Sequence, residues 1–131
     1  MLLPLALALT LFVPQGGQKP GLPDTPQGRR VAAYLAAFNS GDEAKFVQAH
    51  EEHFAKSVLD KISVERRKEM FKKMRGDFAR LSADKVTKAT DRQIVIETAT
   101  TSGDTATFTF DFEEAAPHKI SGIGVDVRGG E

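Results

Sequence analysis

The nine residues Tyr34-Leu-Ala-Ala-Phe-Asn-Ser-Gly-Asp42 predict a tight joint between two helices. Before the joint, apolar side chains recur with the helical spacing i, i+3, i+4 and i+7, at Val31, Tyr34, Leu35 and Phe38. Asn39 and Ser40 are weak helix formers, and Gly41 can take the left-handed conformation that closes a helix. The Asp42 carboxylate can then cap the helix that follows. We therefore expect two helices that share one core.

Length and charge limit the class of protein. The chain has 131 residues, enough for one domain with one hydrophobic core. It carries 18 basic and 18 acidic residues, and this balance gives no support to nucleic-acid binding, which usually needs a basic surplus. The sequence contains no cysteine, which excludes disulfides, thiol nucleophiles and cysteine–zinc sites.

The first residues predict export. Residues 1–13 are almost wholly apolar, and thirteen residues make about 20 Å of helix, too short for the roughly 30 Å apolar core of a bilayer. We interpret residues 1–18 as a signal peptide and residues 19–25 as a linker, so the mature protein is expected to be secreted or periplasmic. No Lys or Arg precedes the apolar run and no clean Ala-x-Ala cleavage site follows it, and the alternatives are an uncleaved N-terminal anchor or a disordered apolar tail.

The remaining chain predicts three helices followed by four strands. Amphipathic patterns favour helices at 26–39, 42–55 and 64–80. After Leu81 the period changes from 3.6 to 2, and strands are expected at 85–90, 93–100, 105–113 and 118–128. A change of phase near Gly122 predicts a bulge. The fold class is therefore α+β: three N-terminal helices packed on a curved four-stranded antiparallel sheet, within a domain at 26–128 and before a tail at 129–131.

This order of elements resembles the nuclear transport factor two-like superfamily, which includes ketosteroid isomerases and polyketide-cyclase-like (SnoaL-like) proteins. The resemblance covers about residues 24–128 and implies a cone-shaped, cystatin-like fold. Two runs, GRRVAAYLAAFNSGD (28–42) and PHKISGIGV (117–125), are similar to an exported bacterial version that often precedes a secreted serine hydrolase. No hydrolase domain follows here, so the resemblance implies an accessory domain that stands alone.

The resemblance also implies what the domain does. We expect an exported, non-catalytic domain that binds a small apolar ligand or a partner protein, with no cofactor, no metal and no membrane contact after signal removal. The pocket would be lined by aromatic and apolar side chains of the cone: Tyr34, Phe38, Phe71, Met74, Phe108, Phe110 and Phe112. One alternative is an accessory subunit of a separately encoded secreted hydrolase. Superfamily members often form homodimers through the open sheet face, for which the threonines of 105–113 are a candidate.

A second alternative is an isomerase- or cyclase-like enzyme that uses Tyr34. This tyrosine matches the position at which ketosteroid isomerases hold an oxyanion-hole hydroxyl. Such enzymes also need a carboxylate inside the pocket, and the strand pattern directs Glu97 and Asp111 away from it. We therefore expect no catalytic residue, and a buried carboxylate within reach of the Tyr34 hydroxyl would favour the enzyme.

Three further patterns have simpler interpretations. His50 and His53 are at i+3, whereas the zinc protease motif HExxH has i+4 spacing, and no third ligand is visible. Ser82-Ala-Asp-Lys85 matches the Ser-x-x-Lys nucleophile pattern but lacks its companion motifs, so we expect a turn. The basic residues between 66 and 80 alternate with acidic ones, as on a solvated helix face, and binding to an anionic surface is the alternative.

Overall fold

The computed structural model describes residues 21–128 of the chain. The predicted signal peptide, the first part of the linker and the predicted tail lie outside these residues. The described elements are α2 (Pro26–Asn39), α3 (Glu43–His53), α4 (Lys56–Leu59), α5 (Val64–Asp77), β1 (Lys85–Ala89), β2 (Gln93–Ala99), β3 (Thr105–Phe112) and β4 (Ile120–Arg128). No helix within 21–128 is long and apolar enough to span a bilayer.

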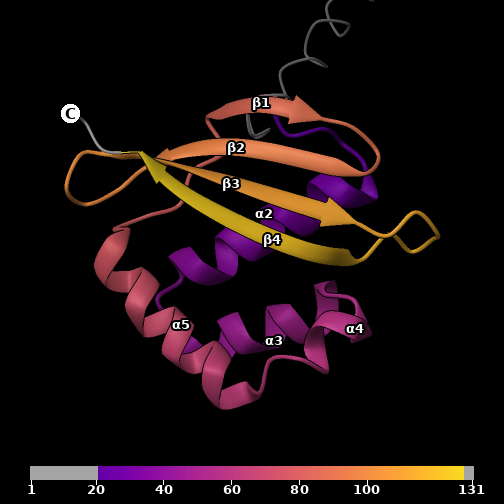
Figure 1. Ribbon diagram of the computed structural model, residues 1–131, viewed down its shortest axis with the longest axis horizontal. Coiled ribbons are helices and arrows are strands. Elements are labelled where there is room, and N and C mark those ends of the chain that lie inside the picture. The colour runs from indigo at the N-terminus through magenta and orange to yellow at the C-terminus, as the bar shows by residue number, and fades with distance from the viewer. Residues whose placement is uncertain (1–20, 129–131) are drawn as a thin grey trace, which may run out of the picture.

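The four strands form one open antiparallel sheet in the order β1-β2-β3-β4. Figure 1 shows this sheet as a curved layer, with the helices gathered on one side of it. The ring of Tyr34 in α2 contacts the ring of Phe110 in β3, at a centroid distance of 5.6 Å. The predicted α+β fold, with helices packed on one face of an antiparallel sheet, is therefore confirmed.

The joint between α2 and α3 forms as its sequence predicts. Gly41 has a φ of +76°, the left-handed conformation that a residue with a side chain rarely takes. One carboxylate oxygen of Asp42 accepts hydrogen bonds from the backbone N–H groups of Ala44 at 2.9 Å and Lys45 at 3.3 Å. The two helices then pack through the rings of Tyr34 and Phe46, whose centroids are 5.5 Å apart.

The core lies between the helices and the inner face of the sheet. Inward-facing residues of β3 are fully or almost fully buried, at Ala106, Phe108, Phe110 and Phe112. Opposite them lie apolar residues of the helices, at Val31, Tyr34, Leu35, Phe38, Phe46 and Phe71. Because a buried aromatic side chain removes roughly 150–250 Å² from water, this cluster dominates the packing.

A bulge in β4 brings all its apolar residues to the inner face. Phe112 is opposite Ile120, but Asp111 is opposite Gly122, so Ser121 is an extra residue in β4. Ile120 and Ile123 therefore face the same side although their spacing is odd. The bulge that the phase change near Gly122 predicts is confirmed.

Three predicted boundaries are wrong. The helix expected to reach residue 80 ends at Asp77, because Phe78 turns into an extended conformation and packs its ring 5.4 Å from Phe108. The last strand begins at Ile120 and not at residue 118, because His118 has a φ of +59°, which interrupts an extended chain. The helix expected at 42–55 also ends earlier, at His53.

The short helix α4 was not predicted. Its residues Val58 and Leu59 are partly buried and pack against the core.

Candidate functional site

The seven residues predicted to line a pocket lie together in the packed core. Six are at most 6% exposed, and Met74 is half-buried against them. Their rings are in contact, for example Phe38 with Phe71 at 5.8 Å and Phe108 with Phe110 at 6.3 Å. Four pockets within residues 21–128 are lined by other side chains. A ligand held by these seven residues would have to displace closely packed groups.

The Tyr34 hydroxyl lies in an apolar environment. It donates to the sulfur of Met74 at 3.9 Å, and burial raises the pKa of Tyr34. The enzyme alternative needs a carboxylate at this hydroxyl, but no aspartate or glutamate between residues 21 and 128 is buried. Glu97 pairs with Lys85 at 3.3 Å, and Asp111 accepts a hydrogen bond from Gln93, both on the outer face of the sheet.

The two histidines of α3 bind different partners. His50 is buried, its Nδ1 is 2.9 Å from the Phe46 carbonyl oxygen, and its ring stacks on Phe54 at 4.4 Å. The carbonyl oxygen can only accept, so Nδ1–H is the donor, and burial lowers the pKa of His50.

His53 accepts a hydrogen bond at Nδ1 from the Arg30 guanidinium at 2.9 Å. Burial, and then the positive charge of Arg30, lower the pKa of His53. Within the part of the chain that the structure describes, no group of three histidine or acidic side chains could hold a metal ion.

Ser82 and Lys85 serve the turn into the sheet. The Ser82 hydroxyl accepts a hydrogen bond from the Asp84 N–H at 3.1 Å, and the Ser82 N–H donates to Thr98 at 3.1 Å. The Lys85 ammonium lies beside Glu97 and not beside the Ser82 hydroxyl. The Ser-x-x-Lys pattern therefore makes a turn here, as expected.

One basic residue of α5 is not on the surface. Arg67 is only 4% exposed, binds the Glu51 carboxylate at 2.8 Å, and donates to the carbonyls of Leu59 and Ile62. It joins α3, the loop after α4, and α5. The regular helical spacing of Arg67 with Met70, Phe71 and Met74 is the signal in the sequence that places it on the buried face.

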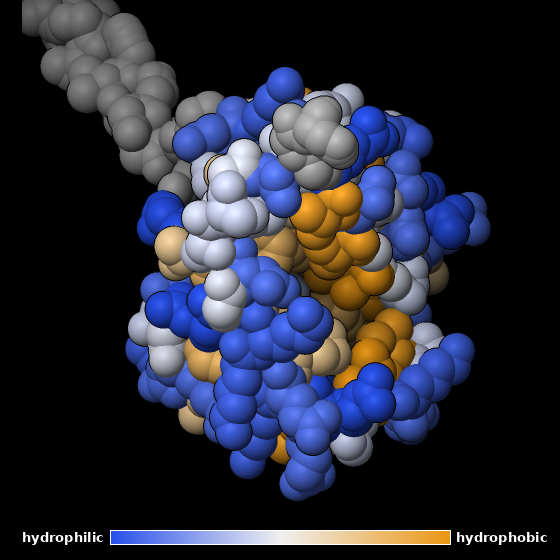
Figure 2. Space-filling view, turned by 60° about the vertical axis from the view of Figure 1, so that its left-hand side comes forward, coloured by the Kyte–Doolittle hydropathy of each residue, from blue (hydrophilic) through white to orange (hydrophobic). Residues whose placement is uncertain are grey.

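Apolar side chains on the inner face of β4 are exposed, although the inner faces of the neighbouring strands are buried. Ile123, Val125 and Val127, here named the inner β4 stripe, lie opposite the buried residues Phe110, Phe108 and Ala106 of β3. They share the inner face of the sheet with those residues, yet Val125 is 49% exposed and Val127 is 51% exposed. Figure 2, in which the side of the molecule that carries α5 comes forward, shows exposed hydrophobic surface on this side.

The backbone edge of β4 is open as well. The Ala55 N–H donates to the Ile120 carbonyl at 2.7 Å, and this bond covers the start of the strand. Beyond Ile120, the side of β4 away from β3 makes no backbone hydrogen bond to another part of residues 21–128. At the far end, Val127 borders a pocket of about 340 Å³ that is also lined by Asp77 and Asp104.

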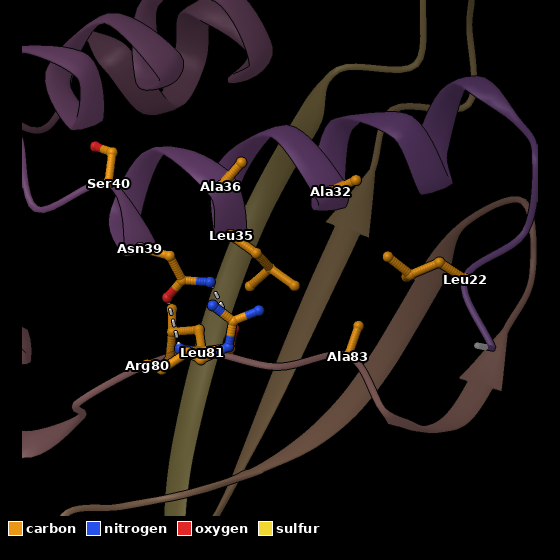
Figure 3. A pocket seen from close by; sticks show the side chains of 9 residues that line it. All are labelled: Leu22, Ala32, Leu35, Ala36, Asn39, Ser40, Arg80, Leu81 and Ala83. Atoms are coloured by element: carbon orange, nitrogen blue, oxygen red, sulfur yellow. Dashed lines mark hydrogen bonds between the residues drawn. The ribbon is translucent and has the colours of Figure 1, made fainter. Parts of the chain in front are cut away.

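A separate pocket lies between α2 and the chain that leads into β1, and we name it the α2 pocket. It has a volume of about 350 Å³, and Figure 3 shows its lining. Apolar walls come from Leu22, Ala32, Leu35, Ala36, Leu81 and Ala83. Asn39, Ser40 and Arg80 add polar groups. Sequence reasoning missed this pocket, because its small alanines lie beside the apolar stripe of α2 and the pattern marks only the stripe itself.

A family model described as "ORF 12 gene product N-terminal" matches residues 22–115, which include α2 to β3 and most of the described chain. No curated protein and no solved structure matches the chain.

Proposed function

We propose that this chain, which belongs to the ORF 12 gene product N-terminal family, is an exported non-catalytic domain that binds a partner protein. The observation that carries the proposal is the inner β4 stripe, whose Val125 and Val127 are left half-exposed by the rest of residues 21–128. Val125 and Val127 face the side on which the rest of the sheet is buried, and half of each residue is exposed. Full burial of a valine stabilises by roughly 1.5–3 kcal/mol, so covering the exposed halves would contribute about 1 kcal/mol each.

The free edge of β4 indicates how a partner would bind. An extended segment can add to an open strand edge through main-chain hydrogen bonds, while its alternate side chains enter pockets along the strand. Residues on one face of such a segment would cover Val125 and Val127. An open strand edge can also pair with the strands of other chains and cause aggregation, so proteins usually cover or disrupt such edges.

The alternation of side chains along β4 indicates the chemistry of the segment. Val125 and Val127 lie on the inner face of the sheet, whereas Asp126 between them lies on the outer face. We therefore propose an extended partner segment whose alternate apolar side chains cover Val125 and Val127.

The resemblance to exported accessory domains supports one class of partner, a separately encoded secreted hydrolase. The description of the family as an N-terminal part is consistent with a domain that works beside another domain. We also propose that the chain is a member of the nuclear transport factor two-like superfamily. The helices packed on one face of a curved antiparallel sheet support this assignment. Export is supported by the apolar run at residues 1–13.

The packing favours a protein partner over a small apolar ligand in the cone, because the predicted lining residues contact one another. It also disfavours the isomerase-like alternative, since the Tyr34 hydroxyl donates to the Met74 sulfur and no aspartate or glutamate within residues 21–128 is buried.

Site-specific photo-cross-linking in the host tests the proposal. A benzophenone side chain at position 125 faces the inner side of the sheet, whereas the same group at the neighbouring Asp126 faces the outer side. We expect one defined adduct from position 125 that is absent from position 126. Its purified partner should then bind the unmodified chain saturably. An adduct with twice the mass of the chain would identify a second copy instead, and equal adducts from both positions would contradict the proposal.

A further inference from the structure

The α2 pocket combines an apolar floor with a cation at its rim. Leu35 and Ala83 are buried and Leu22 is half-buried, and these residues form apolar walls of the pocket. Its volume of about 350 Å³ lies at the lower end of the range for small-molecule sites, roughly 300–1,000 Å³.

Two of the polar lining groups already have partners. The Asn39 side chain donates to the Leu81 carbonyl at 2.8 Å and accepts from the Leu81 N–H at 2.8 Å, as the dashed lines in Figure 3 show. The Ser40 hydroxyl donates to the Ala37 carbonyl at 2.7 Å and accepts from the Asp42 N–H at 3.1 Å. These bonds hold the wall in place and leave neither group unpaired for a ligand.

Arg80 is different. Figure 3 shows its guanidinium turned toward Leu35 at the pocket. The residue is exposed, and within residues 21–128 its side chain makes no hydrogen bond or ion pair with a carboxylate or carbonyl group. A guanidinium presents five N–H donors in a planar fork that matches a carboxylate bidentately.

We propose that the α2 pocket binds a small carboxylate with an apolar body. The carboxylate would pair with Arg80, and the hydrocarbon would lie against Leu35, Ala36 and Ala83. A neutral apolar molecule would gain no ion pair with the guanidinium, and a small inorganic anion would leave the apolar walls empty. The site is separate from the inner β4 stripe, so this proposal and the proposed function can fail independently.

Octanoate is the probe for this proposal, and two control ligands each keep one of its features. 1-Octanol has the hydrocarbon chain without the negative charge, and inorganic phosphate has the negative charge without the hydrocarbon. Binding to the full mature chain is measured by calorimetry and by amide chemical shifts. We expect saturable octanoate binding, with shifts centred on Leu22, Ala36 and Ala83, and at least tenfold weaker binding of octanol and phosphate. Arg80→Gln should weaken octanoate at least tenfold. Arg66→Gln, which removes the same charge from an exposed position of α5, should leave it within twofold.

A second variant tests the apolar half. Ala36 is exposed at the pocket, so Ala36→Leu fills space without loss of helix propensity and should abolish octanoate binding while circular dichroism stays unchanged. The proposal is overturned if octanoate does not bind, if octanol or phosphate binds equally well, or if Arg80→Gln has no effect. Shifts centred on the inner β4 stripe instead of the α2 pocket would overturn it too.

Discussion

Phe108 and Val125 lie directly opposite each other on β3 and β4, yet Phe108 is fully buried and Val125 is 49% exposed. The two residues share the inner face of the sheet, so the pleat alone would bury both. The difference arises because the helices cover β3 but leave the far part of the edge strand β4 uncovered.

This relationship predicts unequal costs of truncation. Phe108→Ala should lower the free energy of unfolding by about 3–5 kcal/mol, because it leaves a cavity in the packed core. Val125→Ala should cost less than about 1 kcal/mol, since half of the residue already contacts water. Urea denaturation of both variants checks this. A cost for Val125→Ala as large as that for Phe108→Ala would mean that the inner β4 stripe is covered in the isolated chain.

The joint between α2 and α3 depends on the backbone of Gly41. Gly41→Ala should destabilise the protein by about 1 kcal/mol, because alanine pays a steric cost at a φ of +76° although its Cβ would have space. Gly124→Ala is the matched control, since its φ is not positive and a Cβ added there would meet no atom of the described chain within 4 Å. Thermal unfolding compares the two variants, and equal melting temperatures would contradict the role of the joint.

The ion pair between Glu51 and Arg67 is asymmetric, with side-chain exposures of 55% and 5%. Glu51→Gln should cost only about 1 kcal/mol, because the carboxylate is half in water and its charge is screened. Arg67→Ala should cost about 3 kcal/mol, because the carbonyls of Leu59 and Ile62 lose their donors and a cavity forms. Urea denaturation gives both values. The reverse order would show that the charge pair, and not the buried hydrogen bonds, holds α5 to the loop before it.

His50 predicts a loss of stability at mildly acidic pH. Its pKa is lowered in the folded state, so below its ordinary value of about 6.5 the unfolded chain takes up a proton that the folded chain resists. Stability from the neutral ring is therefore complete above about pH 6.5 and falls as the pH decreases through the lowered folded-state pKa. The melting temperature should fall less between pH 7.5 and pH 5.0 in His50→Gln than in the parent, because the variant lacks the proton uptake of the His50 ring. Gln48→Ala, at an exposed position of the same helix, is the control and should keep the parental slope.

The sequence was sufficient for the elements whose residues interact locally. The spacing of Val31, Tyr34, Leu35 and Phe38 places one face of α2 in the core, and the Gly41–Asp42 pair ends one helix and caps the next. The alternation in 105–113 identifies the buried face of β3. In each case the period of the side chains carries the information, and tertiary contacts agree with it.

The candidate sites depend on contacts that no local pattern encodes. Periodicity assigns Val125 and Val127 to the inner face, but only the placement of the helices shows that nothing within residues 21–128 covers them. The α2 pocket combines Ala36 with Arg80, which are distant in sequence and meet through the bonds between Asn39 and Leu81. The end of α5 was likewise set by the contact of Phe78 with Phe108 and not by helix propensity.

Binding of a partner to the inner β4 stripe is best tested by calorimetric titration. The titrant is the free, purified partner that photo-cross-linking has identified. The partner is titrated into the parent chain, into Val125→Asp, and into Thr109→Asp, which adds the same charge to the outer face of β3. We predict that Val125→Asp lowers the affinity at least tenfold with its circular dichroism unchanged, and that Thr109→Asp stays within twofold of the parent. Unchanged affinity of Val125→Asp, together with a loss in Thr109→Asp, would place the partner on the outer face and contradict the proposed interface.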